Sequence, residues 1–157
     1  SESQEKNNFY TGMDGISTTK GIFAYPHIGI NLSKTKLQMG LLVGSCFVNS
    51  AGKIGFQGDF LFFPDNQTYR EFNFYFVISG NYFKNSISIG NSETQTTSIQ
   101  ITFGYGFNCP ISKKISFKSN VGIGPLIQRR EFNFHTISPK TRLGFAGLIS
   151  FGINYQL

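Results

Sequence analysis

The chain has 157 residues with a formal net charge of +6, 16% aromatic content, 18 Phe, 18 Gly and no Trp. This length suits one domain, and no apolar run approaches the roughly 20 residues of a membrane helix. If the chain crosses a bilayer it must do so with strands, and the lack of a Lys/Arg cluster among stacking aromatics argues against nucleic acid as a partner.

Residues 1–7 are polar and are predicted to form an N-terminal tail, with one folded domain over residues 8–157. The opening Ser1-Glu2-Ser3-Gln4 has neither the basic region nor the apolar region of a signal peptide. We therefore expect either that a signal peptide has been removed or that the protein is never exported.

Apolar residues alternate with small or polar residues along most of the domain, which is the pattern of strands with two different faces. Asp14 and Gly15 shorten the pattern of the first strand, which is expected partly because bacterial barrels have even strand numbers. The eight predicted strands are Asn8–Ile16, Gly21–Leu32, Lys36–Val48, Lys53–Phe63, Arg70–Tyr82, Thr97–Asn108, Ile115–Gln128 and Arg142–Leu157.

The connections are predicted from their polar, Gly and Pro residues. Short turns are expected at Ser33–Thr35, Asn49–Gly52, Pro64–Asn66 and Cys109–Lys114, and longer polar loops at Phe83–Thr96 and Arg129–Thr141. Pro26 and Pro125 conflict with the pattern, because each removes a ladder donor from a strand that should pair on both sides. A β-bulge could accommodate either proline.

The last strand has a very regular pattern, with apolar residues at Leu143, Phe145, Ile149, Phe151, Ile153, Tyr155 and Leu157. It exceeds the roughly 9–11 residues that a transmembrane strand requires. Its end, Ser150-x-Gly152-x-x-Tyr155-x-Leu157, resembles the terminal assembly signal of bacterial outer-membrane barrels. The departure is Leu157, because that signal usually ends in an aromatic residue.

Side-chain volume decides which face points outward. An eight-stranded barrel has room inside for only a filling of side chains, so the many Phe residues must lie outside and the Gly, Ser, Asn and Gln set inside. We therefore predict an all-β, eight-stranded antiparallel up-and-down transmembrane β-barrel; a soluble avidin- or lipocalin-like barrel is the alternative. The residues predicted to face lipid include Phe74, Phe103 and Phe151, and those predicted to face the lumen include Asn73, Gln100 and Ser150.

Over nearly its whole length the chain resembles small outer-membrane barrels of the OmpA/OmpX type, and its Phe-, Asn- and Ile-rich composition is similar to that of Bacteroidota proteins. The resemblance implies a location in the bacterial outer membrane with both termini in the periplasm. The loops Phe83–Thr96 and Arg129–Thr141 would then be extracellular. The implied partners are outer-membrane lipid, lipopolysaccharide and a larger outer-membrane protein.

Four charged residues are predicted on the lumen face in the periplasmic half: Lys36, Asp59, Glu71 and Lys118. They could form a narrow selective pore or an ion-paired plug. Eight strands leave little bore, and unpaired charges are costly there. We therefore predict a plug in which Lys118 reaches across to Asp59 or Glu71.

A basic rim flanks the last loop and consists of Arg129, Arg130, Lys140 and Arg142. Guanidinium and ammonium groups bind phosphates, so these residues are expected to meet lipopolysaccharide phosphates or an acidic partner. Simple solvated charge is the alternative.

An outer-membrane lipid A deacylase would need a histidine beside a serine on the lipid-facing wall. His135 and Ser138 match this only loosely, since Pro139 follows where a strand should continue. The prediction is therefore a non-enzymatic structural or accessory barrel, a subunit of a complex or a surface recognition element, with a deacylase-like enzyme or a narrow pore as alternatives.

No cofactor or metal site is predicted, because His27, His135, Cys46 and Cys109 fall on different elements. The strand pattern places Cys46 near one end of the barrel and Cys109 near the other. Bridged cysteines need Cα atoms within about 7 Å, so two free thiols are expected.

Overall fold

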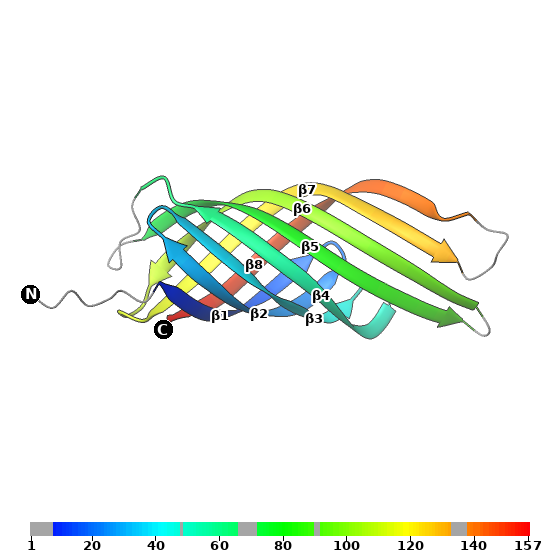
Figure 1. Cartoon of the computed structure of the whole chain (residues 1–157), viewed down its shortest axis with the longest axis horizontal. Helices are drawn as coiled ribbons and strands as arrows, with labels where there is room; N and C mark the ends of the chain where they lie inside the picture. Colours follow the sequence, from blue (N-terminus) through cyan, green and yellow to red (C-terminus); the bar gives the residue numbers. More distant parts are fainter. Residues whose placement is uncertain (1–7, 48, 66–71, 90–91, 133–137) are drawn as a thin grey trace, which may run out of the picture.

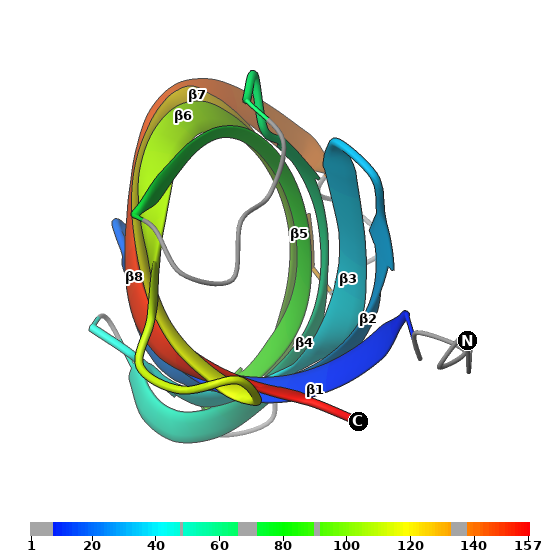
Figure 2. The same cartoon turned by 90° about the vertical axis from the view of Figure 1, so that its left-hand side faces the viewer.

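The computed structural model describes residues 8–47, 49–65, 72–89, 92–132 and 138–157. Consecutive antiparallel strands pair in chain order, and β8 pairs with β1 to close a barrel (Figures 1 and 2). The predicted fold class, including the first strand, is confirmed. The eight strands are β1 (Phe9–Thr18), β2 (Gly21–Leu32), β3 (Thr35–Cys46), β4 (Asn49–Phe62), β5 (Asn73–Ile89), β6 (Ser92–Pro110), β7 (Ile115–Phe132) and β8 (Lys140–Gln156). No helix in the described ranges is long and apolar enough to cross a membrane.

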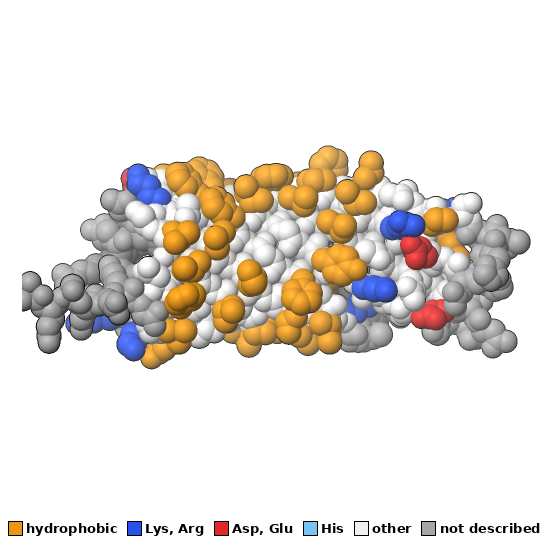
Figure 3. Space-filling view, viewed as in Figure 1, with side chains coloured by type: hydrophobic (Ala, Val, Ile, Leu, Met, Phe, Trp, Pro, Cys, Tyr) orange, Lys and Arg blue, Asp and Glu red, His pale blue; other side chains and the backbone are white. Residues whose placement is uncertain are grey.

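The apolar face of the strands points outward and the face with small and polar residues points into the lumen, as predicted. Apolar side chains cover the middle of the outer wall (Figure 3), and Phe74, Phe103 and Phe151 are 65%, 54% and 56% exposed. Asn73, Gln100 and Ser150 are buried inside the barrel. An apolar belt of this extent is suited to lipid rather than to water.

The two ends of the barrel differ. Both termini lie at one end, which we call the terminal end; at the other end β5 to β8 continue well past β1 to β4 (Figure 1). β5 pairs with β6 as far as Ile89 but with β4 only as far as Phe83, and β8 pairs with β1 only as far as Leu148. The protruding four-stranded sheet, here called the extension, comprises residues 84–89, 92–97, 129–132 and 140–146.

The extension corrects the two predicted long loops. Most of Phe83–Thr96 belongs to β5 and β6, and Arg129–Phe132 and Lys140–Thr141 belong to β7 and β8. Strands that rise above the bilayer need no apolar outer face, so the hydropathy alternation stops there while the hydrogen-bonded ladder continues.

Two of the predicted turns are also corrected. The predicted turn Asn49–Gly52 is the start of β4, which pairs with β3 across a register shift at Ser45 and Cys46. The predicted turn Cys109–Lys114 is shorter, because Cys109 and Pro110 still pair in the β6–β7 ladder.

The two prolines are accommodated without bulges. Pro26 pairs with β1 through Met13, while the β2–β3 ladder is interrupted beside it. Pro125 pairs with β8 through Phe145, while the β6–β7 ladder is interrupted beside it. The register is the same on both sides of each gap, so neither proline is accommodated by a bulge. A proline without an N–H costs least where one of its two ladders is already open.

Candidate functional site

Two clusters of buried apolar side chains occupy the lumen, which the sequence predicted to be filled by small and polar residues. The cluster toward the extension comprises Ile16, Phe23, Tyr25, Leu42, Phe83 and Leu148. The cluster toward the terminal end comprises Leu61, Phe63, Tyr75 and Val77. The sequence did not predict these clusters, because each large residue stands alone on an otherwise small and polar strand face.

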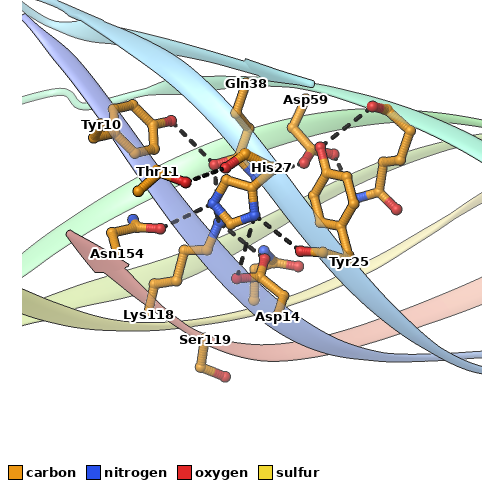
Figure 4. Close-up of polar contacts among 12 residues, drawn as sticks. Tyr10, Thr11, Asp14, Tyr25, His27, Gln38, Asp59, Lys118, Ser119 and Asn154 are labelled. Carbon is orange, nitrogen blue, oxygen red and sulfur yellow. Dashed lines mark hydrogen bonds and ion pairs between the residues drawn. The ribbon is translucent and has the colours of Figure 1, made fainter. Parts of the chain in front are cut away.

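A buried ion pair forms the centre of a polar network in the lumen (Figure 4). The Nζ of Lys118 lies 2.9 Å from the Oδ2 of Asp14, and both side chains are 1% exposed. The same Nζ donates to the Oε1 of Gln38 at 2.8 Å. The network therefore compensates the lysine charge with a carboxylate and a further acceptor, as a buried charge requires.

Asp59 is tied into the same network by amides. It accepts hydrogen bonds from the Nε2 of Gln38 at 2.6 Å and the Nε2 of Gln57 at 2.8 Å. The Tyr10 hydroxyl also donates to the Oε1 of Gln38 at 3.0 Å. Gln38 thus joins Lys118 to Asp59 and links side chains from four strands.

His27 lies beside the ion pair and is held on all sides. Its ring stacks on Tyr25 with centroids 4.9 Å apart, and its Nδ1 lies 3.1 Å from the carbonyl oxygen of Tyr25. Its Nε2 lies 3.0 Å from the Oδ1 of Asn154 and 3.4 Å from the Nζ of Lys118. The sequence placed His27 on the lumen face but did not predict these contacts.

A glycine makes room for the central pair. Gly152 on β8 lies directly opposite Lys118 on β7 and directly opposite Asp14 on β1. A Cβ on Gly152 would collide with the Oδ1 of Asp14. The missing side chain therefore lets two residues on strands that are not neighbours meet across the strand between them.

The same arrangement of polar residue, glycine and polar residue recurs along the inner wall. A Cβ on Gly12 would lie 2.5 Å from both the Nε2 of His27 and the Oδ1 of Asn154, which flank it on β2 and β8. The other instances are Gly29 between Tyr10 and Gln38, and Gly106 between Tyr75 and Asn120. Glycines at these positions let the lumen fill with long polar side chains.

The predicted plug residues are placed as follows. Lys36, Asp59 and Lys118 are buried in the lumen, and Glu71 lies outside the described residues. The Nζ of Lys36 lies 5.4 Å from the ring centroid of Tyr10 and 5.3 Å from that of Phe63, at cation–π distance.

The predicted direct pairing of Lys118 with Asp59 is wrong, because Lys118 pairs with Asp14 and reaches Asp59 through Gln38. Asp14 was taken as an interruption of the first strand. Its lumen-side parity with Tyr10 and Ile16 was the signal that could have identified it.

The predicted basic rim is divided between two faces. Arg130, Lys140 and Arg142 line a small cavity together with Thr96 and Gln128. Arg129 is the neighbour of Arg130 on β7 and therefore points to the opposite face. There its Nε lies 3.0 Å from the Oε1 of Glu131, and both side chains are more than half exposed.

The residues of the predicted assembly signal lie on both faces of β8. Ser150 and Gly152 face the lumen, and Tyr155 and Leu157 are exposed on the outer side. Gly152 thus has a packing role beside Asp14 as well. The role of these four residues in assembly stays a prediction.

The residues considered for other chemistry are scattered. Ser138 is exposed just before β8, and His135 lies outside the described residues. Cys109 is a free thiol, whereas the side chain of Cys46 is not among those described. Within the described ranges, no three His, Cys, Asp or Glu side chains gather closely enough to hold a metal ion.

No protein-family model matches the sequence, and no curated protein matches it. Solved structures do match the fold. The N-terminal β-barrel domain of Pseudomonas aeruginosa OprF aligns over 96% of this chain and 97% of its own, with a TM-score of 0.68 and 9% identity. Neisserial surface protein A aligns over 96% and 97%, with a TM-score of 0.65 and 12% identity.

A major outer membrane protein from Thermus thermophilus also matches, over 95% of this chain and 98% of its own, with a TM-score of 0.52 and 12% identity. At such low identities these likenesses show the fold. A closed barrel of this fold with an apolar belt around its outer wall is built for a bilayer. The protein is therefore a β-barrel of the bacterial outer membrane.

Proposed function

We propose that this barrel is a non-enzymatic and non-conducting anchor whose extension acts as a recognition surface or as the contact surface of an accessory subunit. The barrel wall holds the protein in the membrane, and the extension presents polar side chains beyond the apolar belt (Figure 3). The function is thereby assigned to an end of the barrel and not to its interior.

The filled lumen is the observation that carries this proposal. The Lys118–Asp14 pair and its amide partners span the interior between two apolar clusters. A conducting path would have to separate a buried ion pair or displace large apolar side chains. Both changes are costly in a barrel of eight strands, whose interior is only wide enough for side chains.

Conductance in planar lipid bilayers tests the proposal. The purified barrel should give no steady unitary conductance in roughly 1 M salt, a concentration that screens surface charge. A porin reconstituted in the same bilayers provides the positive control. Steady unitary steps from the unmutated protein would show that the lumen is an open pore and would overturn the proposal.

The deacylase-like alternative receives a separate test. Ser138 lies between strands and not on the lipid-facing wall that such a mechanism requires. Mass spectrometry of lipid A from cells producing the protein should match that from cells producing Ser138→Ala or His135→Ala. Loss of an acyl chain that depends on these residues would make the protein an enzyme.

Lipopolysaccharide and a larger outer-membrane protein are the partners we propose for the outer surface, and the Phe-, Asn- and Ile-rich composition is our basis for proposing a Bacteroidota source. Crosslinking in native outer membrane followed by pull-down should recover a specific larger protein. Recovery of the barrel alone at all crosslinker lengths would contradict an accessory-subunit role.

A further inference from the structure

The two faces of the extension carry very different charge. Strand alternation places Lys84, Glu93, Arg129 and Glu131 on the outer face, where two cations and two anions balance. Arg130, Lys140 and Arg142 share the inner face and line one small cavity. The inner face therefore carries three positive charges together with Thr96 and Gln128.

These three positively charged side chains lie close together and repel one another. Arg130 and Lys140 lie directly opposite each other on β7 and β8, which is unfavourable for like charges. Arg142 lies two residues further along β8, on the same face. Gln128, opposite Arg142, donates to the hydroxyl of Ser98 at 3.2 Å and so fixes the floor of the cavity.

No carboxylate of the extension relieves this charge. Glu131 lies on the other face and is engaged by Arg129, and Glu93 shares that outer face by alternation. Residues 90–91 and 133–137, which lie outside the described ranges, contain no Asp or Glu in the sequence. Among the described residues none of these three cations is paired with a carboxylate, so their charge is available to an anion from solution.

We propose that the inner face of the extension binds a soluble anion bearing phosphoryl groups. Two guanidinium groups can each donate paired hydrogen bonds to phosphoryl oxygens, and the ammonium of Lys140 adds charge. The Thr96 hydroxyl supplies a neutral donor at the same cavity. This inference rests on the proposed function, in which the extension is the recognition surface, and it names the class of ligand.

The position of the cavity selects a soluble ligand over a lipid headgroup. The cavity is lined by residues of the inner face of the extension, beyond the apolar belt, and therefore lies outside the part of the barrel that the bilayer surrounds. Below it, the apolar cluster around Phe83 and Leu148 closes the lumen. A ligand therefore reaches the cavity from the aqueous phase beyond the extension.

Calorimetric titration with inorganic pyrophosphate tests the proposal on the whole chain, refolded in zwitterionic detergent without lipopolysaccharide. Arg130→Gln combined with Arg142→Gln should weaken binding at least about tenfold, because each loses charge-assisted hydrogen bonds. Arg129→Gln is the control for Arg130→Gln, tested also as a single variant, since each removes one positive charge and the two residues are adjacent on opposite faces. Arg129→Gln should change the affinity by less than about twofold, as expected for a screened surface charge.

Failure of the unmutated protein to bind pyrophosphate, or equal loss in the control and the double variant, would overturn the proposal. Repeating the titration in nanodiscs with and without lipid A distinguishes the two sources of phosphate. Unchanged pyrophosphate affinity supports a soluble ligand, and competition by embedded lipid A contradicts it. The bilayer conductance experiment is independent of these outcomes, so a failed ligand does not by itself refute a closed barrel.

Discussion

Lys118 and Asp14 come from opposite parts of the chain and form the ion pair at the centre of the lumen. Taking both charges out of water is expensive, and the hydrogen bond from Lys118 to Gln38 offsets part of that cost. Removing one member of the pair should therefore lower the free energy of unfolding more than removing both, since the remaining group would be an uncompensated buried charge.

We expect Lys118→Met to lower the free energy of unfolding by about 3–5 kcal/mol. The double variant Lys118→Met/Asp14→Asn should lose clearly less unfolding free energy, because no unpaired buried carboxylate is left. Denaturant titrations in lipid vesicles measure both changes. Lys84→Met is the control, as Lys84 is exposed on the extension. A loss in Lys118→Met no larger than in this control would contradict the buried pair.

The glycine beside this pair leads to a second prediction on the same strand. Gly152→Ala should destabilise the barrel by about 1–3 kcal/mol, as overpacking does, because its Cβ would collide with Asp14. Gly147→Ala on the outer side of β8 meets only the Gly122 carbonyl oxygen at 3.9 Å and should be nearly neutral. Equal unfolding free energies of the two variants would refute the close approach.

At the scale of single strands, β6 crosses the apolar belt and continues into the extension. Phe103 and Thr97 lie on its outer face, at different heights along the same strand. Phe103 belongs to the belt, and Thr97 lies where pairing has passed beyond the end of β4. The cost of a charge should therefore differ sharply between them.

Phe103→Lys should cost about 2–4 kcal/mol, the penalty for a cation near the bilayer midplane, and Thr97→Lys about 0–1 kcal/mol. Folding titrations into phospholipid vesicles compare the two variants directly. Similar penalties at both positions would mean that the apolar belt is not the part of the wall that contacts lipid.

At the scale of the whole molecule, the barrel is asymmetric along its axis, with both termini at one end and the extension, formed by the longer strands β5 to β8, at the other (Figure 1). Outer-membrane barrels have short periplasmic turns and longer extracellular segments. This asymmetry predicts that the extension lies outside the cell, where a phosphorylated ligand could reach it.

Cysteine labelling on intact cells tests this orientation. In a background with Cys46→Ser and Cys109→Ser, a membrane-impermeant maleimide should label Ser86→Cys on the extension and leave Lys113→Cys at the terminal end unlabelled. Both native positions are exposed, so access is decided by the membrane. Labelling of Lys113→Cys alone would reverse the orientation.

The strand number, the closed antiparallel class and the direction of side chains such as Phe103 and Gln100 could all be predicted from the sequence. Alternation is a local property of a strand, and a lipid-facing wall imposes it wherever the strand is in the bilayer. The predicted strand ends were wrong above the belt for the same reason, because that requirement no longer applies there and the extension has the composition of a loop.

The partners inside the lumen became known only from the three-dimensional arrangement of the strands. Whether Lys118 meets Asp59 or Asp14 depends on the register between β7, β8 and β1, and on Gly152 lying between the two charges. The separation of Arg129 from Arg130 followed from the continuation of β7 beyond the belt. Register and closure are set by contacts between distant segments, which no local pattern in the sequence records.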